Sequence, residues 1–500
     1  MAFKIHYPFI YGVLLFLVLQ FGGARAMSAP LHSASYADPG NHEALLKWKP
    51  KIDEIVRPAF ESERTAGIIV GVAERNSTFF IGYGSTNFKG GKMPDENTIF
   101  EIGSVTKVFT GIMLAKKVLE HKVALDDPVR KLLPAYFRIP RFGSKEITLL
   151  DLSTHYSGLP RIPTNMNLEH IVNPYKNYTG YKMREFLAGY QLPREPGTVW
   201  EYSNLGAGLL GYALGVKSNT TYKRMVLSEI CGPLKLKDTR FRLNEEQLSR
   251  FAQGYNADLE KTAHWDFDVI APAGGLRSTA SDMLKLASAH LKDNGTLSQA
   301  MTMATGPYRK SGIPDNDMGL GWIIMHKGGF DIFWHNGGTG GFSSFVAINK
   351  AKNVSLVVLS NTSAATSSVV DDIAGSIMKC FLGLPYEIPK WPKEVKIDQD
   401  MLDIYTGNYE LTSKSDQSSS GAAEKARLTL TREANRIVFS QDRKVIYKVY
   451  PESETRFFAK LIPLTVTFSK GKTDRAVRMT IRVDKEESEW RQIPAPQEKR

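Results

Sequence analysis

Cysteine is nearly absent from this 500-residue chain, which contains only Cys231 and Cys380. Two cysteines cannot build a disulfide framework or a cysteine metal cluster. The apolar surroundings of both favour two separate buried thiols, with a single bridge in an oxidising compartment as the alternative. H-E-x-x-H, other grouped metal ligands and a phosphate-binding glycine loop ahead of a helix are also missing. We therefore expect no metal and no cofactor.

A continuous basic block is missing as well. The formal net charge is +12, but the 64 Lys and Arg residues are scattered among 52 Asp and Glu residues. No aromatic platform is interleaved with them, so we expect no nucleic-acid partner. The charge indicates a mildly basic surface that is weakly attracted to an anionic cell envelope.

The longest N-terminal apolar run, Pro8–Phe21, is shorter than the ~20 residues that a membrane-spanning helix needs. It follows Lys4 and precedes Ala24-Arg25-Ala26. This order of a positive charge, an apolar run and a small-x-small site is typical of a secretory signal. The sequence predicts a signal peptide over residues 1–26 and export to a periplasm or to the outside of the cell.

The rest of the chain has the composition of a globular protein of more than one domain, with 42% hydrophobic and 23% charged residues. β-branched and alternating runs predict strands over residues 67–73, 78–83, 342–348 and 354–359, and apolar spacing predicts helices from residue 105 and over 369–382. A proline-rich break over residues 384–392 indicates a domain boundary. Beyond it, short strand-like runs predict a small antiparallel barrel: residues 426–430, 436–440, 444–449, 464–469 and 476–483.

A hydroxyl and an amine share one helix face in Ser104-Val105-Thr106-Lys107, because residues three apart on a helix are neighbours. The positive helix end favours a developing alkoxide and disfavours an ammonium, so it moves the lysine towards the neutral form that a base requires. The same S-x-x-K spacing also begins at Ser376 and at Ser469. The motif alone therefore does not identify a site.

Two further motifs distinguish Ser104 from the other matches. Tyr202-Ser203-Asn204 stands between a turn and an apolar helix, where side chains can project into a cleft. Trp334–Phe342 contains four glycines on its approach to a strand, and glycine lets a substrate backbone come close. Tyr175-Lys176-Asn177 lies in a polar loop, and His326-Lys327-Gly328-Gly329 is predicted to be a hairpin tip.

The ordered motifs Ser104-x-x-Lys107, Tyr202-x-Asn204 and His335-x-Gly337 resemble those of the penicillin-recognising serine hydrolases. This group includes class C β-lactamases, D-alanyl-D-alanine peptidases and related esterases. Further segments of this chain are similar to the group: Phe100–Ser104, Leu125–Val129, Leu152–Pro160, Pro272–Leu276 and Gly319–Trp322.

The resemblance covers residues 45–385 and implies an α/β fold, an antiparallel sheet flanked by helices with an inserted helical domain. Both ends of the segment would contribute strands to the sheet. Residues 386–399 would be a linker, and residues 400–490 a small all-β barrel that resembles a lipocalin-like domain.

The resemblance also implies roles for individual residues. Ser104 would be the nucleophile, Lys107 its amine partner and Tyr202 the phenol that carries protons to the leaving atom. Asn204 would hold Lys107 and the substrate amide. The backbone N–H groups of Ser104 and Gly338 would form the oxyanion hole.

The remaining predicted substrate-binding residues are His335 and Gly337. In the third motif His335 stands where a β-lactamase of this group has a permanent cation. With an ordinary pKa near ~6.5, its help in binding a carboxylate should weaken as the pH rises. His155 is interpreted as a structural hydrogen-bonding residue.

The sequence thus predicts a serine hydrolase that forms an acyl-enzyme on Ser104. Its substrate would be a small molecule or a peptide, and it would cleave the amide bonds of D-amino-acid peptides, β-lactams or both. A carboxylesterase on the same scaffold is the first alternative. A catalytically silent penicillin-binding or scaffold protein is the second.

Overall fold

The computed structural model describes residues 33–37 and 42–493, except residues 76, 89, 167–171, 293–294, 364–368, 415–425, 443, 471–476 and 485. The predicted signal peptide, residues 1–26, lies outside the described residues. In the described part of the chain, no helix is both long and apolar enough to cross a membrane.

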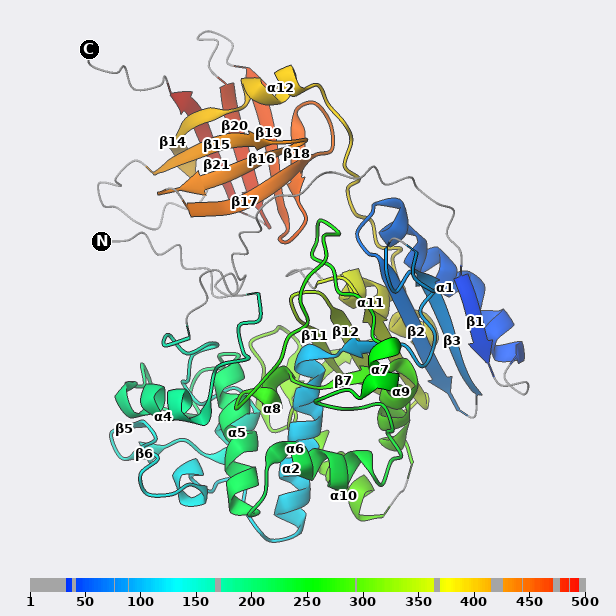
Figure 1. The fold of residues 1–500 in the computed structure, drawn as a ribbon, viewed down its shortest axis with the longest axis vertical. Helices are drawn as coiled ribbons and strands as arrows, with labels where there is room; N and C mark the ends of the chain where they lie inside the picture. The colour runs from blue at the N-terminus through cyan, green and yellow to red at the C-terminus, as the bar shows by residue number, and fades with distance from the viewer. Residues whose placement is uncertain are drawn as a thin grey trace.

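A large antiparallel sheet forms the centre of the N-terminal four-fifths of the chain (Figure 1). Its order is β1-β3-β2-β13-β12-β11-β10-β9-β8. The early strand β2 pairs with the late strand β13, with Val70 opposite Val358, so both ends of the segment do build the sheet. The described strands are β1 Ser33–Ala37, β2 Gly67–Glu74, β3 Ser77–Gly84, β8 Arg309–Lys310, β9 Asn316–Met318, β10 Ile323–Lys327, β11 Phe330–Gly338, β12 Ser343–Asn349 and β13 Val354–Ser360.

Helices cover both faces of this sheet. On one face Val70 packs in a cluster with Ile55 of α1 (His42–Glu61) and Ile373 of α11 (Val369–Leu382). On the other face Ile69 packs in a cluster that includes residues of α2 (Thr106–Leu119) and α9 (Ala280–Ala289). Neighbouring residues of a strand point to opposite faces of the sheet. Both faces are covered by helices, so every residue of β12 and β13 is buried. The predicted α/β class and antiparallel sheet are confirmed.

A mostly helical segment is inserted between β3 and β8. It contains two small two-stranded antiparallel sheets: β4 (Ile99–Glu101) with β7 (Arg277–Thr279), and β5 (Arg141–Phe142) with β6 (Lys145–Glu146). Its other described helices are α3 Leu149–Ser153, α4 Gly180–Gly189, α5 Asn204–Lys217, α6 Tyr222–Val226, α7 Glu245–Ser249, α8 Ala271–Gly274 and α10 Thr296–Ala304.

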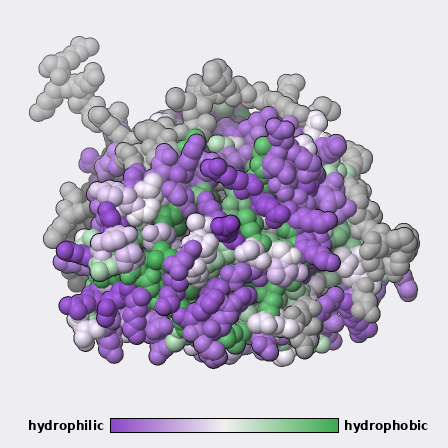
Figure 2. Space-filling model, turned by 60° about the horizontal axis from the view of Figure 1, so that its bottom comes forward, coloured by the Kyte–Doolittle hydropathy of each residue, from purple (hydrophilic) through white to green (hydrophobic). Residues whose placement is uncertain are grey.

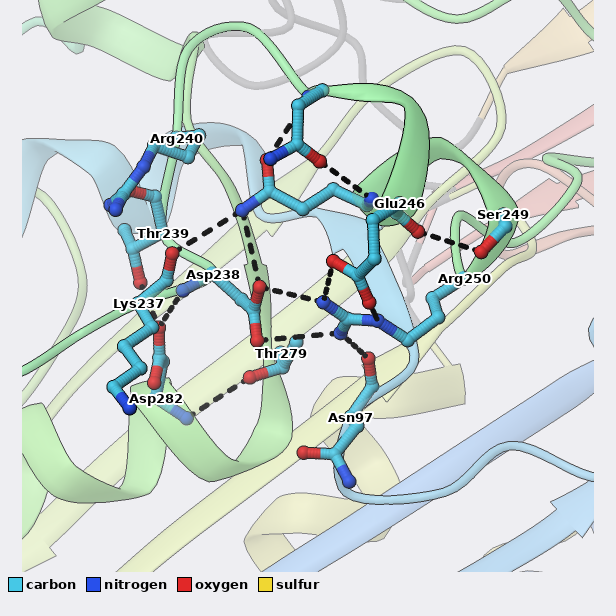
Figure 3. Close-up of polar contacts among 12 residues, drawn as sticks. Asn97, Lys237, Asp238, Thr239, Arg240, Glu246, Ser249, Arg250, Thr279 and Asp282 are labelled. Atoms are coloured by element: carbon cyan, nitrogen blue, oxygen red, sulfur yellow. Dashed lines mark hydrogen bonds and ion pairs between the residues drawn. The ribbon is translucent and has the colours of Figure 1, made fainter.

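A polar network anchors β4, the strand that leads to Ser104 (Figure 3). The guanidinium of Arg250 pairs with Asp238 at 2.7 Å and with Glu246 at 2.7 Å, and it donates to the carbonyl of Asn97 at 2.6 Å. The backbone N–H of Ile99 in turn donates to the carbonyl of Arg250 at 2.9 Å. Five N–H donors in a rigid fork let one arginine join three chain segments. The start of β4 is therefore held in place by residues about 150 positions away.

The C-terminal part is a closed antiparallel barrel, with strands in the order β14 to β21 (Figure 1). Its interior is filled by an apolar cluster that includes Tyr409, Phe457 and Trp490. The predicted all-β barrel is confirmed. Its elements are α12 Gln399–Ile404, β14 Gly407–Lys414, β15 Arg427–Glu433, β16 Arg436–Gln441, β17 Lys444–Pro451, β18 Arg456–Ala459, β19 Leu464–Lys470, β20 Val477–Val483 and β21 Glu486–Ile493.

The segment between sheet and barrel is attached at both ends. The carbonyl of Glu387 accepts a hydrogen bond from the hydroxyl of Ser376 on α11 at 2.8 Å, and Trp391 packs on the α1–α11 side of the sheet. Further on, the N–H of Val395 donates to the carbonyl of Pro451 in the barrel at 2.9 Å. The chain thus crosses from the part built on the large sheet to the barrel between Trp391 and Val395.

Asp258 joins the barrel to the rest of the protein. Its carboxylate lies 3.0 Å from the guanidinium of Arg436 and 3.7 Å from the amine of Lys460, and it accepts a hydrogen bond from the phenol of Tyr450. All three partners belong to the barrel, whereas Asp258 belongs to the hairpin formed around Tyr255 and Lys261. Asp258 thus shares two barrel cations, each less than one-fifth exposed, with Glu433 at Arg436 and with Glu394 at Lys460.

Replacing Asp258 by alanine should weaken this contact by about 2 kcal/mol, because the phenol of Tyr450 loses its acceptor and Arg436 and Lys460 keep only Glu433 and Glu394. We expect differential scanning calorimetry to resolve separate transitions for the sheet and the barrel. Glu260→Ala, on the exposed side of the same hairpin, is the matched control and should unfold as the wild type does. A single unshifted transition in Asp258→Ala would contradict the role assigned to Asp258.

Both cysteines are free thiols, as predicted. Cys231 is buried, but the expectation that Cys380 is also buried is wrong, since it is only half-buried. It lies near the end of α11, where the chain turns away from the sheet core towards Tyr386.

Polar residues cover most of the surface in the view of Figure 2, and hydrophobic residues appear in small groups between them. Among the described residues no cluster of His, Cys, Asp and Glu could hold a metal ion.

Candidate active site

Ser104 lies in a tight turn between β4 and α2. Residues Gly103–Val105 form one turn of 3-10 helix, and α2 follows directly from Thr106. Gly103 has a φ of +46°, and a Cβ there would stand 2.7 Å from the backbone nitrogen of Gly338. Only glycine satisfies both demands. Ser104 is thereby placed at the entry to the helix, half-buried, beside the end of β11.

Lys107 is buried and fully hydrogen-bonded. Its Nζ lies 3.0 Å from Oγ of Ser104, 2.8 Å from Oδ1 of Asn204 and 2.7 Å from the carbonyl oxygen of Ala273. Burial, followed by the charge of Arg161, lowers the pKa of Lys107 well below its usual value. A neutral amine has two N–H donors for the two carbonyl oxygens and one lone pair left for the hydroxyl proton of Ser104. The geometry therefore suits Lys107 to act as a base.

Tyr202 also contacts the hydroxyl of Ser104. Its ring lies 4.8 Å from Nζ of Lys107, and its phenol interacts with the hydroxyl of Ser104. Burial raises the pKa of Tyr202 to about 12, although the charge of Arg161 and the hydrogen bond with Ser104 act in the opposite direction. The phenol is therefore protonated at neutral pH and can donate a proton.

The start of α5 orients the second motif. The hydroxyl of Ser203 caps the helix by accepting the N–H of Gly206 at 2.8 Å and donates to the carbonyl of Pro160 at 2.7 Å. Asn204 is the first helical residue, and its N–H donates to the carbonyl of Arg161 at 3.1 Å. With its backbone tied in this way, Asn204 can direct its side-chain oxygen at Lys107.

His155 supports Tyr202 from behind. Its Nδ1 accepts the N–H of Ser203 at 3.2 Å, and its ring centroid lies 4.3 Å from that of Tyr202. It is a non-glycine residue with a φ of +66°, an unfavourable conformation that surrounding packing must maintain. Burial, followed by the charge of Lys107, lowers its pKa, so the ring is neutral. These contacts agree with the structural role predicted for His155.

The third motif lies within strand β11, not in an approach to a strand as the glycines suggested. Gly337 pairs with Ser344 and Gly338 with Ser343 of β12. Glycine is required because a Cβ at Gly337 would stand 2.1 Å from the carbonyl oxygen of Ile102 and 3.0 Å from the backbone nitrogen of Ser104. β11 therefore lies directly against the Ser104 turn, with Gly338 exposed, as an oxyanion hole formed by these two backbones would need.

His335 is neutral, which overturns the expectation of an imidazole that titrates near ~6.5. It is 1% exposed, and burial, followed by the charge of Lys107, lowers its pKa to about 3. Its Nδ1 lies 2.6 Å from the carbonyl oxygen of Asn336 and donates to it, while Nε2 has no hydrogen-bond partner among the described residues. His335 therefore carries no charge, and its Nε2 is a buried hydrogen-bond acceptor.

Sequence reasoning missed three residues around the site. Tyr175 was set aside with its polar loop, yet it is buried, stacks on Phe267 at 4.6 Å and accepts a hydrogen bond from Nδ2 of Asn204 at 3.3 Å. The one available signal was its Y-x-N pattern. Arg161 lies over the ring of Tyr202 at 4.9 Å. Its sequence signal was limited to the preceding segment Leu152–Pro160, which is similar to the penicillin-recognising group.

Glu101 is the third missed residue. It accepts the N–H of Trp265 at 2.7 Å, and burial raises its pKa to about 7 despite interactions with Thr339 and Arg277 that lower it. Glu101 lies three positions before Ser104, and Thr339 directly follows Gly338. Glu101, through its interaction with Thr339, therefore connects the two backbone segments that meet at the site.

Comparison with known proteins places these motifs in a wider group. The family model described as "Beta-lactamase" matches residues 52–375. The D-alanyl-D-alanine-carboxypeptidase/endopeptidase AmpH of Escherichia coli (strain K12) is 28% identical over 331 residues, which are 63% of this chain and 84% of that protein. Penicillin-binding protein 4* of Bacillus subtilis (strain 168) is 28% identical over 402 residues, 75% of this chain and 83% of that protein.

Solved structures share the fold. The β-lactamase/D-alanine carboxypeptidase of Yersinia pestis, complexed with citrate, superimposes with a TM-score of 0.60 at 24% identity. The match covers 67% of this chain and 99% of that one. A class C β-lactamase matches with a TM-score of 0.59 at 22% identity, over 67% of this chain and 96% of that one.

Proposed function

This chain belongs to the beta-lactamase family and is a serine hydrolase, and on that premise we propose that Ser104 forms an acyl-enzyme with D-amino-acid peptides and β-lactams. Ser104, Lys107 and Tyr202 are the proposed catalytic residues. Asn204, His335, Gly337 and Gly338 are the proposed substrate-binding residues. No cofactor enters the scheme.

The observation that carries the proposal is the environment of Lys107. Its Nζ has Ser104, Asn204 and Ala273 within 3.0 Å, and its pKa is lowered by burial. The neutral amine takes the proton of the Ser104 hydroxyl as Oγ forms its bond to the scissile carbonyl carbon. The N–H groups of Ser104 and Gly338 then stabilise the negative charge that develops on the carbonyl oxygen.

Tyr202 completes the first half of the reaction. Its phenol is protonated and donates to the leaving nitrogen as the C–N bond breaks, and the Lys107 ammonium returns a proton to the phenolate. The product is an ester on Ser104. Water attacks this ester with the same groups acting in reverse, which releases the acid and restores the hydroxyl.

The choice of substrate is supported by the names of the relatives, two of which are a D-alanyl-D-alanine carboxypeptidase/endopeptidase and a penicillin-binding protein. We also propose that residues 1–26 direct export to a periplasm or to the outside of the cell, and that the exported protein touches the envelope only peripherally. Residues 45–385 would form the hydrolase unit and residues 400–490 a lipocalin-like unit joined by 386–399.

Tyr202→Phe should separate amide from ester chemistry. An amine leaves only when protonated, whereas p-nitrophenolate leaves without a proton, so loss of the phenol should slow an acyl-D-Ala-D-Ala peptide by about 100-fold and a p-nitrophenyl ester far less. The measurement is kcat/KM for both substrates in wild type and variant. Tyr178→Phe, which removes a hydroxyl that contacts Asn165 away from the site, is the matched control.

The alternatives give different results in the same assay. A carboxylesterase would cleave the ester and leave the D-Ala-D-Ala peptide and a chromogenic cephalosporin intact. A silent scaffold would cleave none of them and would not be labelled by a fluorophosphonate. Hydrolysis of the peptide with equal losses on both substrates in Tyr202→Phe would contradict the proton-donor role.

A further inference from the structure

The basic side chains of the catalytic cluster are withdrawn from water. Lys107, His155 and His335 are all buried, and burial lowers the pKa of each. Burial thus disfavours a positive charge on each of the three. A permanent positive charge must come from a group that stays in contact with water.

Arg161 is such a group. Its side chain is exposed and ends in a positively charged guanidinium. Its Cζ lies 4.9 Å above the ring of Tyr202. Its charge lowers the pKa of Lys107, His155 and Tyr202, so it acts on the catalytic cluster itself.

The position of Arg161 is fixed by the second motif. The carbonyl of Pro160 accepts the hydroxyl of Ser203, and the carbonyl of Arg161 accepts the N–H of Asn204. Both hydrogen bonds join this segment to the residues that directly follow Tyr202. The backbone of Arg161 therefore cannot move away from the site without disturbing the start of α5.

The hydrogen-bonding capacity of Arg161 is unused among the described residues, none of which forms an ion pair with it. The N–H donors of a guanidinium lie in one plane as a rigid fork. Two such donors match the two oxygens of a carboxylate. The phenol under the guanidinium contacts Ser104, so the scissile bond and the cation are separated by one tyrosine side chain.

We propose that Arg161 binds the free carboxylate of the substrate, one residue beyond the scissile bond, and so selects peptides and lactams that carry this group. The inference rests on the proposed function and adds the residue that determines specificity. Arg161 touches the substrate only at the carboxylate. It takes no part in the proton transfers.

The test compares two substrates that differ only in charge, an acyl-D-Ala-D-Ala peptide and its C-terminal amide. Arg161→Gln keeps a hydrogen-bonding side chain without the charge and should lower kcat/KM for the acid by about 30-fold, chiefly through KM. The amide and a neutral p-nitrophenyl ester should lose much less, because for them Arg161→Gln removes only the effect of the Arg161 charge on the pKa of Lys107 and Tyr202. Arg161→Lys keeps the charge but lacks the two-pronged guanidinium, so its kcat/KM for the acid should lie between those of the wild type and Arg161→Gln.

Arg184→Gln is the matched control, because Arg184 also lies over a tyrosine ring, Tyr181 at 5.1 Å, but on α4. It should leave both substrates unchanged. Equal losses on acid and amide in Arg161→Gln, or no loss on either, would overturn the proposal.

Fluorophosphonate labelling separates this proposal from the one on which it rests. If the wild type is labelled on Ser104 and cleaves the amide, but Arg161→Gln does not discriminate against the acid, the specificity proposal alone fails. If the wild type is not labelled and cleaves none of the substrates, the proposed function fails and the role of Arg161 fails with it.

Discussion

Ser104→Ala should lower kcat for peptide, lactam and ester substrates by about 10⁵-fold and abolish covalent labelling by a fluorescent penicillin or fluorophosphonate. The nucleophile forms the bond on which every later step depends. Among the described residues, Nζ of Lys107 is hydrogen-bonded to no hydroxyl other than that of Ser104. Steady-state kinetics and in-gel fluorescence measure the two effects. Folding should be unaffected, because the Ser104 side chain is only half-buried.

Two serines of the chain provide matched controls for this variant. Ser376 begins another S-x-x-K pattern on α11, where its hydroxyl donates to the carbonyl of Glu387 at 2.8 Å. Ser469 begins a third and lies exposed in β19. Ser376→Ala and Ser469→Ala should keep full labelling. Persistent labelling of Ser104→Ala would show that the nucleophile is another residue.

Lys107→Ala should lower kcat by about 10³–10⁴-fold, because the base that accepts the Ser104 proton is lost. Lys107→Arg should be equally inactive, since a guanidinium does not lose its proton in this pH range. Rapid-mixing measurements of acylation with a chromogenic cephalosporin give the rate directly. Lys379→Ala, at the matching position of the α11 pattern, should behave as the wild type does.

The pH dependence provides a second test of Lys107. Its pKa is lowered well below the ordinary lysine value, and the amine acts as a base only when unprotonated. Activity should therefore be present above this lowered pKa and should fall as acid protonates the amine. His335, with a pKa of about 3, should add no step between pH 5 and 8. A Lys107→Arg variant as active as the wild type would refute the base assignment.

Some elements could be predicted because their signals are local. The strands β2, β3, β12 and β13 are rich in β-branched residues, and the barrel strands β15, β16 and β17 follow one another with short turns. The strands β14 and β21 were missed for a physical reason. Their outward faces are polar or charged, as in Glu486–Ile493, so no alternating pattern stands out before the pairing with each other closes the barrel.

The site could be predicted only as far as spacing reaches. Ser104 and Lys107 meet on any helix that contains them, because residues three apart share a face. The pairing of Lys107 with Asn204 and with the carbonyl of Ala273 crosses 97 and 166 positions and depends on how α2, α5 and α8 pack. Tyr175 could not be assigned in the same way, since only the packed fold brings its loop to Asn204.

The sequence by itself determined which chemical groups are available and which of them are neighbours along one element: the hydroxyl of Ser104, the amine of Lys107, the phenol of Tyr202 and the glycines of β11. The tertiary structure alone decided their protonation states. A pKa depends on how much water is excluded and on which charges are brought near, and both are set by segments far apart in the chain. Burial makes His335 neutral, and the packed fold places the guanidinium of Arg161 over the ring of Tyr202.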